Sequence, residues 1–278
     1  MGWLSEPFGY GFFRHGFVVA TLAGGLCGLV GTYVVLRGMS YIGHGLSHAI
    51  FGGAAASALA SFNFYAGAGL WGLASALVIG RVTRRRLIGA DAAIGVVTTA
   101  SFALGVALLN RYGQVRKSLD AALFGSVLGV TATDVWVVAG VAAFAAAVVF
   151  VAYRHLLFVT FDPEVAEASG VPTARVDALF MLVLAVSILG TMKVLGVVLV
   201  AAALVIPPTV ARMLTDSFAR MLWLSVVIGT VCGAVGMLWS YYADVSSGAA
   251  IVLTGAALFA VTFGLTGPRG LGRASPVH

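Results

Sequence analysis

The sequence contains very few charged residues. Of its 278 residues only 9% are Asp, Glu, Lys or Arg, and 60% are hydrophobic. A soluble domain carries about 25% charged residues, and a chain with far fewer cannot cover its surface with polar groups in water. Lipid removes that requirement, so the composition excludes an ordinary soluble domain and indicates an integral membrane protein.

Other absences exclude whole classes of function. The sequence has no Gly-x-x-x-x-Gly-Lys-Ser/Thr loop, so ATP-driven transport would need its ATPase on a separate polypeptide. It has no Ser/His/Asp constellation and no paired catalytic carboxylates, and we therefore expect a transport subunit and not an enzyme. The two cysteines, Cys27 and Cys232, lie inside apolar runs. They are predicted to be core residues and neither a disulfide nor a metal pair.

The apolar runs predict the number of crossings. A bilayer core needs about 20 apolar residues per helix. Runs that approach this length are residues 12–36, 44–62, 66–79, 92–109, 132–153, 178–192, 194–213, 221–242 and 248–264. We predict an all-α, polytopic bundle of about eight transmembrane helices, in a range of seven to nine. The apolar stretch 119–130 is too short to cross and is predicted to lie at the interface or to re-enter.

Glycine is abundant, with 36 residues. In a membrane bundle, small residues at a spacing of four let two helix backbones approach closely. The alternative is chance spacing in a glycine-rich chain. The pairs with this spacing that we consider are Gly24 with Gly28, Gly125 with Gly129, and Gly229 with Gly233.

Basic residues indicate the orientation. The net charge is +6, and its basic residues cluster at the ends of apolar runs, strongest at 81–86. This pattern is typical of cytoplasmic helix ends that face anionic lipid, and we infer no nucleic-acid site from it. The resulting parity places the N-terminus outside and the C-terminus inside. The loop with Arg111, Arg116 and Lys117 then falls outside, against the rule.

One hydrophilic segment, residues 158–177, interrupts the apolar pattern. Asp162 is suited to an N-cap, Pro163 to the first turn, and Glu164 to the positive end of the helix dipole. Gly170 can end such a helix, and Pro172 prevents its continuation. The segment predicts a short capped helix on the cytoplasmic side, either with a docking role or as an ordinary loop helix.

Two histidines are the best candidates for a metal site. His44 and His48 are four residues apart, so they share one face of a helix. Two imidazoles at this spacing can bind one divalent ion, and a site with so few protein ligands can also release it. The alternatives are hydrogen bonds to a neighbouring helix or a wet helix end near Tyr41. Ser47 is a weaker candidate, because serine in a helix commonly bonds to a backbone carbonyl.

Several other polar positions lie near predicted helix ends. Asp91 and Asp134 are interpreted as N-caps, with Asp91 kept as a pathway candidate. Lys193 either marks an outer turn or pairs with a carboxylate, and we favour the turn. Pro207 and Pro208 either kink a helix, as a gate would, or stand near its end.

Several segments of the chain resemble the permeases of bacterial zinc and manganese ABC importers, and together they span roughly residues 12–263. The resemblance begins with Gly-Thr-Tyr-Val-Val-Leu-Arg-Gly-Met at 31–39 and Gly-His-Gly-Leu-Ser-His-Ala at 43–49. It includes Phe-Asp-Pro-Glu at 161–164 and Ile-Pro-Pro-Thr-Val-Ala-Arg at 206–212. The remaining segments are 91–97, 102–105, 123–129, 196–200 and 240–242.

The resemblance implies an architecture and a set of partners. It implies one permease domain over residues 1–278 of the type II importer kind, multi-pass in the bacterial inner membrane, with a short flexible tail at 266–278. It also implies a homodimer in membrane lipid, cytoplasmic ATP-binding subunits and an extracytoplasmic metal-binding protein. A coupling helix near 162–170 would dock on the ATPase. Its residues would be Asp162, Pro163, Glu164, Ala168 and Gly170.

The resemblance also bears on the metal. Members of this family commonly have aspartate at the first position of Gly-Asp-x-x-x-His, where this chain has His44, whereas His48 matches the pattern. Because imidazole suits zinc and carboxylate suits manganese, we favour zinc as the transported ion, with manganese as the alternative and no permanently bound cofactor. An iron-chelate or vitamin permease would need a wider pathway and no histidine pair. An ATP-independent secondary metal transporter would need mid-span carboxylates, which this sequence lacks.

Overall fold

The computed structural model describes residues 6–60, 62–84, 90–112 and 123–266, and the predicted tail therefore lies almost wholly outside the described residues. Within these ranges the chain is helical and contains no strand, which confirms the all-α class. Its helices are η1 (Pro7–Gly9), α1 (Gly11–Leu36), α2 (Ser40–Leu59), α3 (Phe64–Arg84), α4 (Ala90–Tyr112), α6 (Ala132–Val151), α7 (Tyr153–Phe161), α8 (Pro163–Ala168), α9 (Thr173–Leu195), α10 (Val200–Leu214), α11 (Phe218–Ala243) and α12 (Ser247–Thr266).

Six helices of the described part are long and apolar enough to cross a membrane. The qualifying segments are Gly11–Leu36, Ile94–Arg111, Ala132–Val151, Thr173–Leu195, Phe218–Ala243 and Ser247–Thr266. Two apolar helices, Tyr65–Ile79 and Val200–Leu214, are shorter, and α2 is not among the six. The count of about eight crossings therefore stays a prediction.

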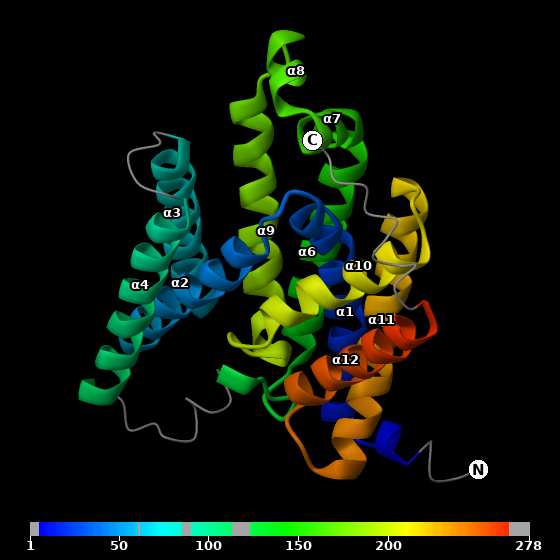
Figure 1. The fold of residues 1–278 in the computed structure, drawn as a ribbon. Helices are drawn as coiled ribbons and strands as arrows, with labels where there is room; N and C mark the ends of the chain where they lie inside the picture. The colour runs from blue at the N-terminus through cyan, green and yellow to red at the C-terminus, as the bar shows by residue number, and fades with distance from the viewer. Residues whose placement is uncertain (1–5, 61, 85–89, 113–122, 267–278) are drawn as a thin grey trace.

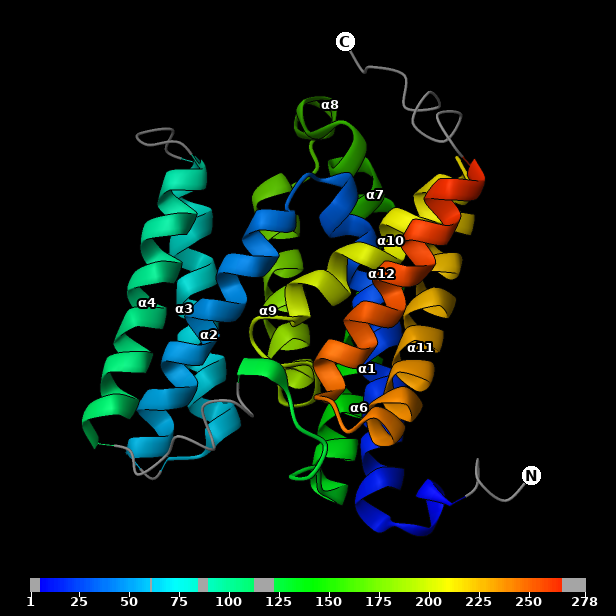
Figure 2. The same cartoon turned by 60° about the horizontal axis from the view of Figure 1, so that its bottom comes forward.

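The helices form two groups on either side of α9. On one side α2, α3 and α4 pack against one another, and on the other side α1 packs against α10 and α11 (Figures 1 and 2). We call the end that holds α7 and α8 the α8 end, and the opposite end, where α1 begins, the far end. Helix α12 ends toward the α8 end in Figure 2. The described part of the chain thus begins and ends at opposite ends of the bundle. This agrees with the predicted parity and requires an odd number of crossings, seven or nine within the predicted range.

Helices α1 and α11 touch through their backbones. A Cβ added to Gly24 would lie 2.0 Å from the carbonyl oxygen of Gly229, and a Cβ added to Gly229 would lie 2.1 Å from that of Gly24. One turn along, the Ser225 hydroxyl donates to the carbonyl of Gly28 at 2.7 Å. Two of the predicted glycine pairs are therefore at a helix contact, as expected from their spacing.

For the third glycine pair the alternative of chance spacing holds. Gly125 and Gly129 lie in the segment between α4 and α6, whose residues 125–131 are not helical. Gly125 has φ +78° and packs on the carbonyl of Val194, whereas nothing lies near a Cβ added to Gly129. A spacing of four has no meaning for packing outside a helix. The structure describes residues 123–130 of the short apolar stretch, and they do not cross the bundle.

The two cysteines are free and buried, which confirms their predicted place in the core. Helix α10 continues through Pro207 and Pro208 and ends only at Leu214, so these prolines do not end the helix. Each proline lacks an N–H donor, so α10 loses backbone hydrogen bonds at this point.

A buried carboxylate at the far end joins three helices. Asp134 of α6 is 5% exposed, and both its oxygens accept from the Lys193 ammonium of α9, at 2.7 and 2.8 Å. The Tyr65 hydroxyl of α3 donates to the same carboxylate. The Thr131 backbone N–H and hydroxyl each donate to it at 2.8 Å, in a capping box.

This cluster corrects two interpretations. The N-cap of α6 is Thr131, and Asp134 stands at the third helical position. Lys193 lies in the last turn of α9 and forms an ion pair with Asp134, although we had favoured a turn. The ion pair and the hydrogen bonds compensate the charge of Asp134, which is 5% exposed, whereas Lys193 remains 36% exposed.

Replacing Gly24 with alanine tests the α1–α11 contact. Because the new Cβ would overlap the Gly229 carbonyl, we expect Gly24→Ala to destabilise the protein by about 2 kcal/mol or more. The measurement is the thermal unfolding temperature of the protein in detergent. The matched control is Gly140→Ala on α6, where a Cβ meets nothing within 4 Å. Equal unfolding temperatures for the two variants would contradict the close approach.

Candidate metal pathway and coupling segment

The histidine pair forms on α2 as its spacing predicts. The Nε2 atoms of His44 and His48 are 3.2 Å apart, and the rings meet edge to face with centroids 4.6 Å apart. The ring of His48 also packs edge to face on Phe102 of α4, with centroids 4.7 Å apart. His44 is exposed and His48 is partly buried. The neighbouring helix therefore fixes one ring, and the other reaches open space.

The distance between the two nitrogens fits one shared ion. Two imidazole nitrogens on a tetrahedral ion at about 2.0–2.1 Å lie about 3.3 Å from each other. Without an ion, one ring can donate to the other across the same distance. In the described residues no third His, Cys, Asp or Glu joins the pair to make a cluster of three. The remaining ligands would therefore be water, backbone oxygen or groups of another chain.

His48 carries an unpaired polar atom. Its Nδ1 is buried and has no hydrogen-bond partner among the described residues. A metal-bound histidine usually donates its other ring N–H to an acceptor, which fixes the ring. Here the contact with Phe102 fixes the ring instead, and the described part of the chain provides no such acceptor. This arrangement is typical of a weak ligand, which suits a site that must release its ion.

The weaker candidates have other local roles. The Ser47 hydroxyl donates to the carbonyl of His44 at 2.7 Å, the backbone bond that we expected of a helical serine. Asp91 lies in the first turn of α4, but its side chain is outside the described part of the structure. A Cβ at Gly45 would press on Ile94 and Thr98 of α4, so α2 and α4 approach closely beside the pair.

The predicted capped helix is present as α8. Asp162 is its N-cap, and its carboxylate accepts from the Val165 N–H at 2.9 Å. Pro163 is the first residue and Glu164 lies in the first turn, as predicted. The helix lies at the tip of the α8 end (Figure 1).

The end of α8 is equally defined. Ala168 is its last residue, and Gly170 follows with φ +83°. The Gly170 N–H donates to Glu167 and the Val171 N–H donates to Ala166, both at 3.0 Å, which is the Schellman pattern. The tip is thus a rigid feature with a fixed shape, as a docking element requires.

Apolar side chains stand exposed at this tip. Val165 of α8 and Phe161 at the end of α7 are both at least half exposed. These two side chains offer apolar surface at the tip of the α8 end.

Sequence reasoning missed one feature near this segment. Arg37 is one of the basic residues at the ends of apolar runs, which we interpret as topology signals, and its guanidinium pairs with Asp177 of α9 at 3.0 Å. The two residues are 140 positions apart. No local pattern could have connected them, because only the packing of α1 on α9 brings them together.

Residues 9–265 match the family model described as the ABC 3 transport family. The chain belongs to this family. The match spans every helix of the bundle from α1 to α11 and nearly all of α12. It includes both the histidine pair and α8.

Individual relatives in the ABC 3 transport family agree with the match. The manganese transport system membrane protein MntC of Halalkalibacterium halodurans is 37% identical over 254 residues, which cover 91% of this chain and 87% of that protein. A probable iron transport system membrane protein of Haemophilus influenzae is 32% identical over 259 residues, 93% of this chain and 95% of that protein. The solved structure described as PsaBC from Streptococcus pneumoniae in complex with Fab has a TM-score of 0.84 and 31% identity, and the match covers 91% of each chain.

These findings confirm the family resemblance inferred from the sequence. The chain is the permease component of a metal ABC transport system, and its relatives are transport components. As a member of the ABC 3 family with several apolar helices, it is a multi-pass protein of the bacterial inner membrane.

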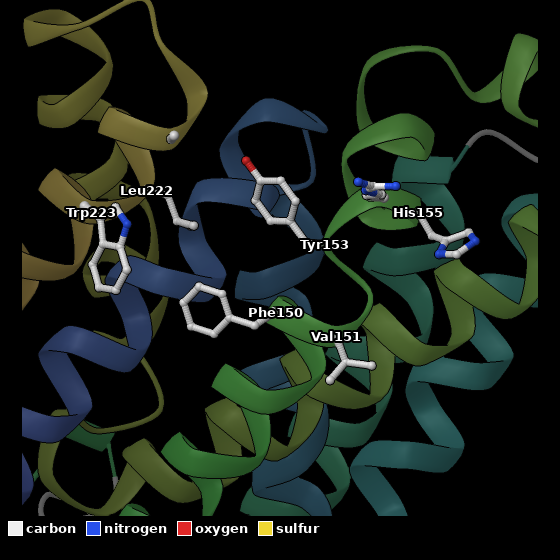
Figure 3. Close-up of a pocket in the computed structure, with 8 residues that line it drawn as sticks. Phe150, Val151, Tyr153, His155, Leu222 and Trp223 are labelled. Atoms are coloured by element: carbon white, nitrogen blue, oxygen red, sulfur yellow. The ribbon is translucent and has the colours of Figure 1, made fainter.

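A cavity of about 500 Å³ lies near the α8 end, apart from the histidine pair. Figure 3 shows Phe150 of α6 and Leu222 and Trp223 of α11 facing one another there, with Tyr153 of α7 close by. The rings of Phe150 and Trp223 are 5.9 Å apart at their centroids. Of the residues that line this cavity, His155 is the one possible metal ligand, and no second His, Cys, Asp or Glu lines it. Its exposed aromatic rings are typical of residues at a membrane interface.

Proposed function

We propose that the chain is the membrane-spanning permease subunit of an ATP-driven manganese importer. In this proposal two copies form the pathway, cytoplasmic ATP-binding subunits drive it, and an extracytoplasmic metal-binding protein delivers the ion. The single observation that carries the proposal is the His44–His48 pair, whose Nε2 atoms are spaced for one divalent ion. The name of a relative that is 37% identical, a manganese transport system membrane protein, supports the choice of metal.

The mechanism follows from the incomplete ligand set. An ion entering the pathway must exchange part of its hydration shell for protein groups, and two neutral imidazoles can replace two waters. Because the pair provides only two ligands, the ion remains partly hydrated and dissociates readily. His48 holds its orientation through Phe102, so exposed His44 is the ring free to capture and hand on the ion.

The preference for zinc finds no support among the relatives, whose names specify manganese or iron. We favoured zinc because imidazole at position 44 is a softer ligand than carboxylate. For equilibrium affinity, imidazole does suit zinc better than manganese. Zinc binds nearly any nitrogen site more tightly than manganese does. Tight binding would hinder release, so selectivity would come from delivery of the ion and not from the affinity of this pair.

Energy coupling is assigned to α8. The segment with Asp162, Pro163, Glu164, Ala168 and Gly170 forms a rigid capped tip. Its exposed apolar side chains are Val165 within α8 and Phe161 at the end of α7. We propose that this tip docks on the ATP-binding subunit as the coupling helix. Its rigid caps would let a push on the tip move α7 and α9 as one body.

Replacing His48 tests the metal site. His48→Gln keeps the size of the side chain and removes the imidazole ligand, so we expect uptake of Mn²⁺ to fall about tenfold or more. Uptake is measured in proteoliposomes that contain the complete complex, with the metal-binding protein and ATP supplied. His15→Gln at the start of α1 is the control and should transport normally. Unchanged uptake of both Mn²⁺ and Zn²⁺ by His48→Gln would contradict the site.

Replacing His44 tests the origin of metal preference. His44→Asp introduces a harder ligand, so we expect the ratio of Mn²⁺ to Zn²⁺ uptake to rise several-fold, by about three- to tenfold. His44→Asn is the matched control, since it has the same size without the charge. The idea fails if Asp and Asn give the same ratio of the two metals.

Replacing Gly170 tests the coupling helix. Valine at φ +83° is strained by about 1–2 kcal/mol although nothing crowds the site, so only the end of α8 should change. We expect Gly170→Val to weaken co-purification of the ATP-binding subunit and to leave metal binding to the permease intact. The control is Gly129→Val, which also meets open space and has no positive φ. Normal assembly and stimulated ATP hydrolysis in Gly170→Val would argue against docking by α8.

A further inference from the structure

Arg37 uses all three of its guanidinium nitrogens on two other helices. Its Nε donates to the Thr160 hydroxyl of α7 at 2.9 Å, and one terminal nitrogen donates to the Leu156 carbonyl of α7 at 3.4 Å. The other terminal nitrogen pairs with Asp177 of α9 at 3.0 Å. The guanidinium also lies over the ring of Phe180, 4.7 Å from its centroid. The side chain is only 8% exposed, so these contacts replace water.

The contacts of Arg37 bracket the coupling segment. Thr160 stands just before α8 and Asp177 just after it, on the helices that enter and leave the tip. Asp162 caps the entry to α8, and Gly170 closes its exit. A displacement of α8 therefore reaches the Arg37 side chain from both sides.

The backbone of Arg37 connects to the histidine pair. Arg37 is the C-cap of α1, and Gly38 follows with φ +64°. The Gly38 N–H donates to Val35 at 3.1 Å and the Met39 N–H donates to Val34 at 2.8 Å, a second Schellman turn. Helix α2 begins at the next residue and carries His44 in its second turn. The turn is rigid, so movement of the Arg37 backbone moves the start of α2.

We propose that Arg37 is the positioning residue that transmits movement of the α7–α8–α9 segment to the histidine-bearing helix α2. The proposal rests on the function proposed above and adds a specific route between the two sites. Arginine suits the role because its planar fork engages two helices at once, which a lysine ammonium cannot do in the same geometry. In this proposal Arg37 acts through its contacts with α7 and α9 and through the α1–α2 turn.

The test is the amount of Mn²⁺ taken up for each ATP hydrolysed by the full complex in proteoliposomes. For Arg37→Gln we expect this ratio to fall about tenfold, while ATP hydrolysis by the assembled complex stays within about twofold of wild type. Arg37→Lys keeps the charge near Asp177 but cannot reach both helices, so its ratio should be intermediate. Arg220→Gln, which removes an exposed arginine from α11 near the α8 end, is the matched control and should behave as wild type.

A double-mutant cycle separates coupling from general damage. Asp177→Asn should lower the uptake ratio on its own, and adding it to Arg37→Gln should have little further effect, because the same contact is already lost. Fully additive effects would overturn the proposal, and so would a wild-type ratio in assembled Arg37→Gln. Should Arg37→Gln fail to assemble, Thr160→Val removes one hydrogen bond to α7 and leaves the ion pair. A wild-type ratio in Thr160→Val would then overturn the proposal.

The outcomes also separate this proposal from the function on which it rests. A wild-type complex that takes up no Mn²⁺, or a His48→Gln complex that takes it up normally, contradicts the proposed function. If His48→Gln lowers Mn²⁺ uptake and Arg37→Gln leaves it unchanged, only the route through Arg37 is contradicted.

Discussion

The close backbone contact between α1 and α11 is the constraint on which the bundle depends. Lipid is as apolar as the helix surfaces, so burial of apolar side chains does not drive helices together within a membrane. Association then relies on close packing and on hydrogen bonds between helices, and the Gly24–Gly229 contact and the Ser225–Gly28 hydrogen bond supply both. Helix α1 in turn packs against α9 and α10, so its position sets that of the central helices.

Within this apolar frame, the described residues include two ion pairs that each contain one buried charge, and both pairs involve α9. Asp177 near its start joins Arg37 of α1, and Lys193 near its end joins Asp134 of α6. Helix α9 follows directly on the coupling segment and lies between the two groups of helices (Figure 1). Its ends are therefore held by electrostatic contacts, and buried apolar side chains pack along the helix between them.

The features that could be predicted from the sequence were those encoded within one or two helical turns. The histidine pair and the caps of α8 depend on spacings of four residues or fewer, and the structure has them as expected. The pairing of Lys193 with Asp134, 59 positions away, depends on the tertiary packing and was not favoured. Gly125 and Gly129 have the right spacing but lie outside a helix, and spacing alone does not show whether a segment is helical. The sequence shows only that Arg37 stands at the end of an apolar run, and the positive-inside rule accounts for that position without any partner.

The two ion pairs of α9 place charges at two levels along its length. Asp177 and Lys193 are 16 residues apart, about 24 Å along a helix. That length is slightly less than the hydrocarbon thickness of about 30 Å, so the charges lie near its two boundaries. A thicker bilayer would draw both pairs into hydrocarbon and would favour local thinning around α9. A change in the chain length of the host lipid therefore affects both ion pairs at once.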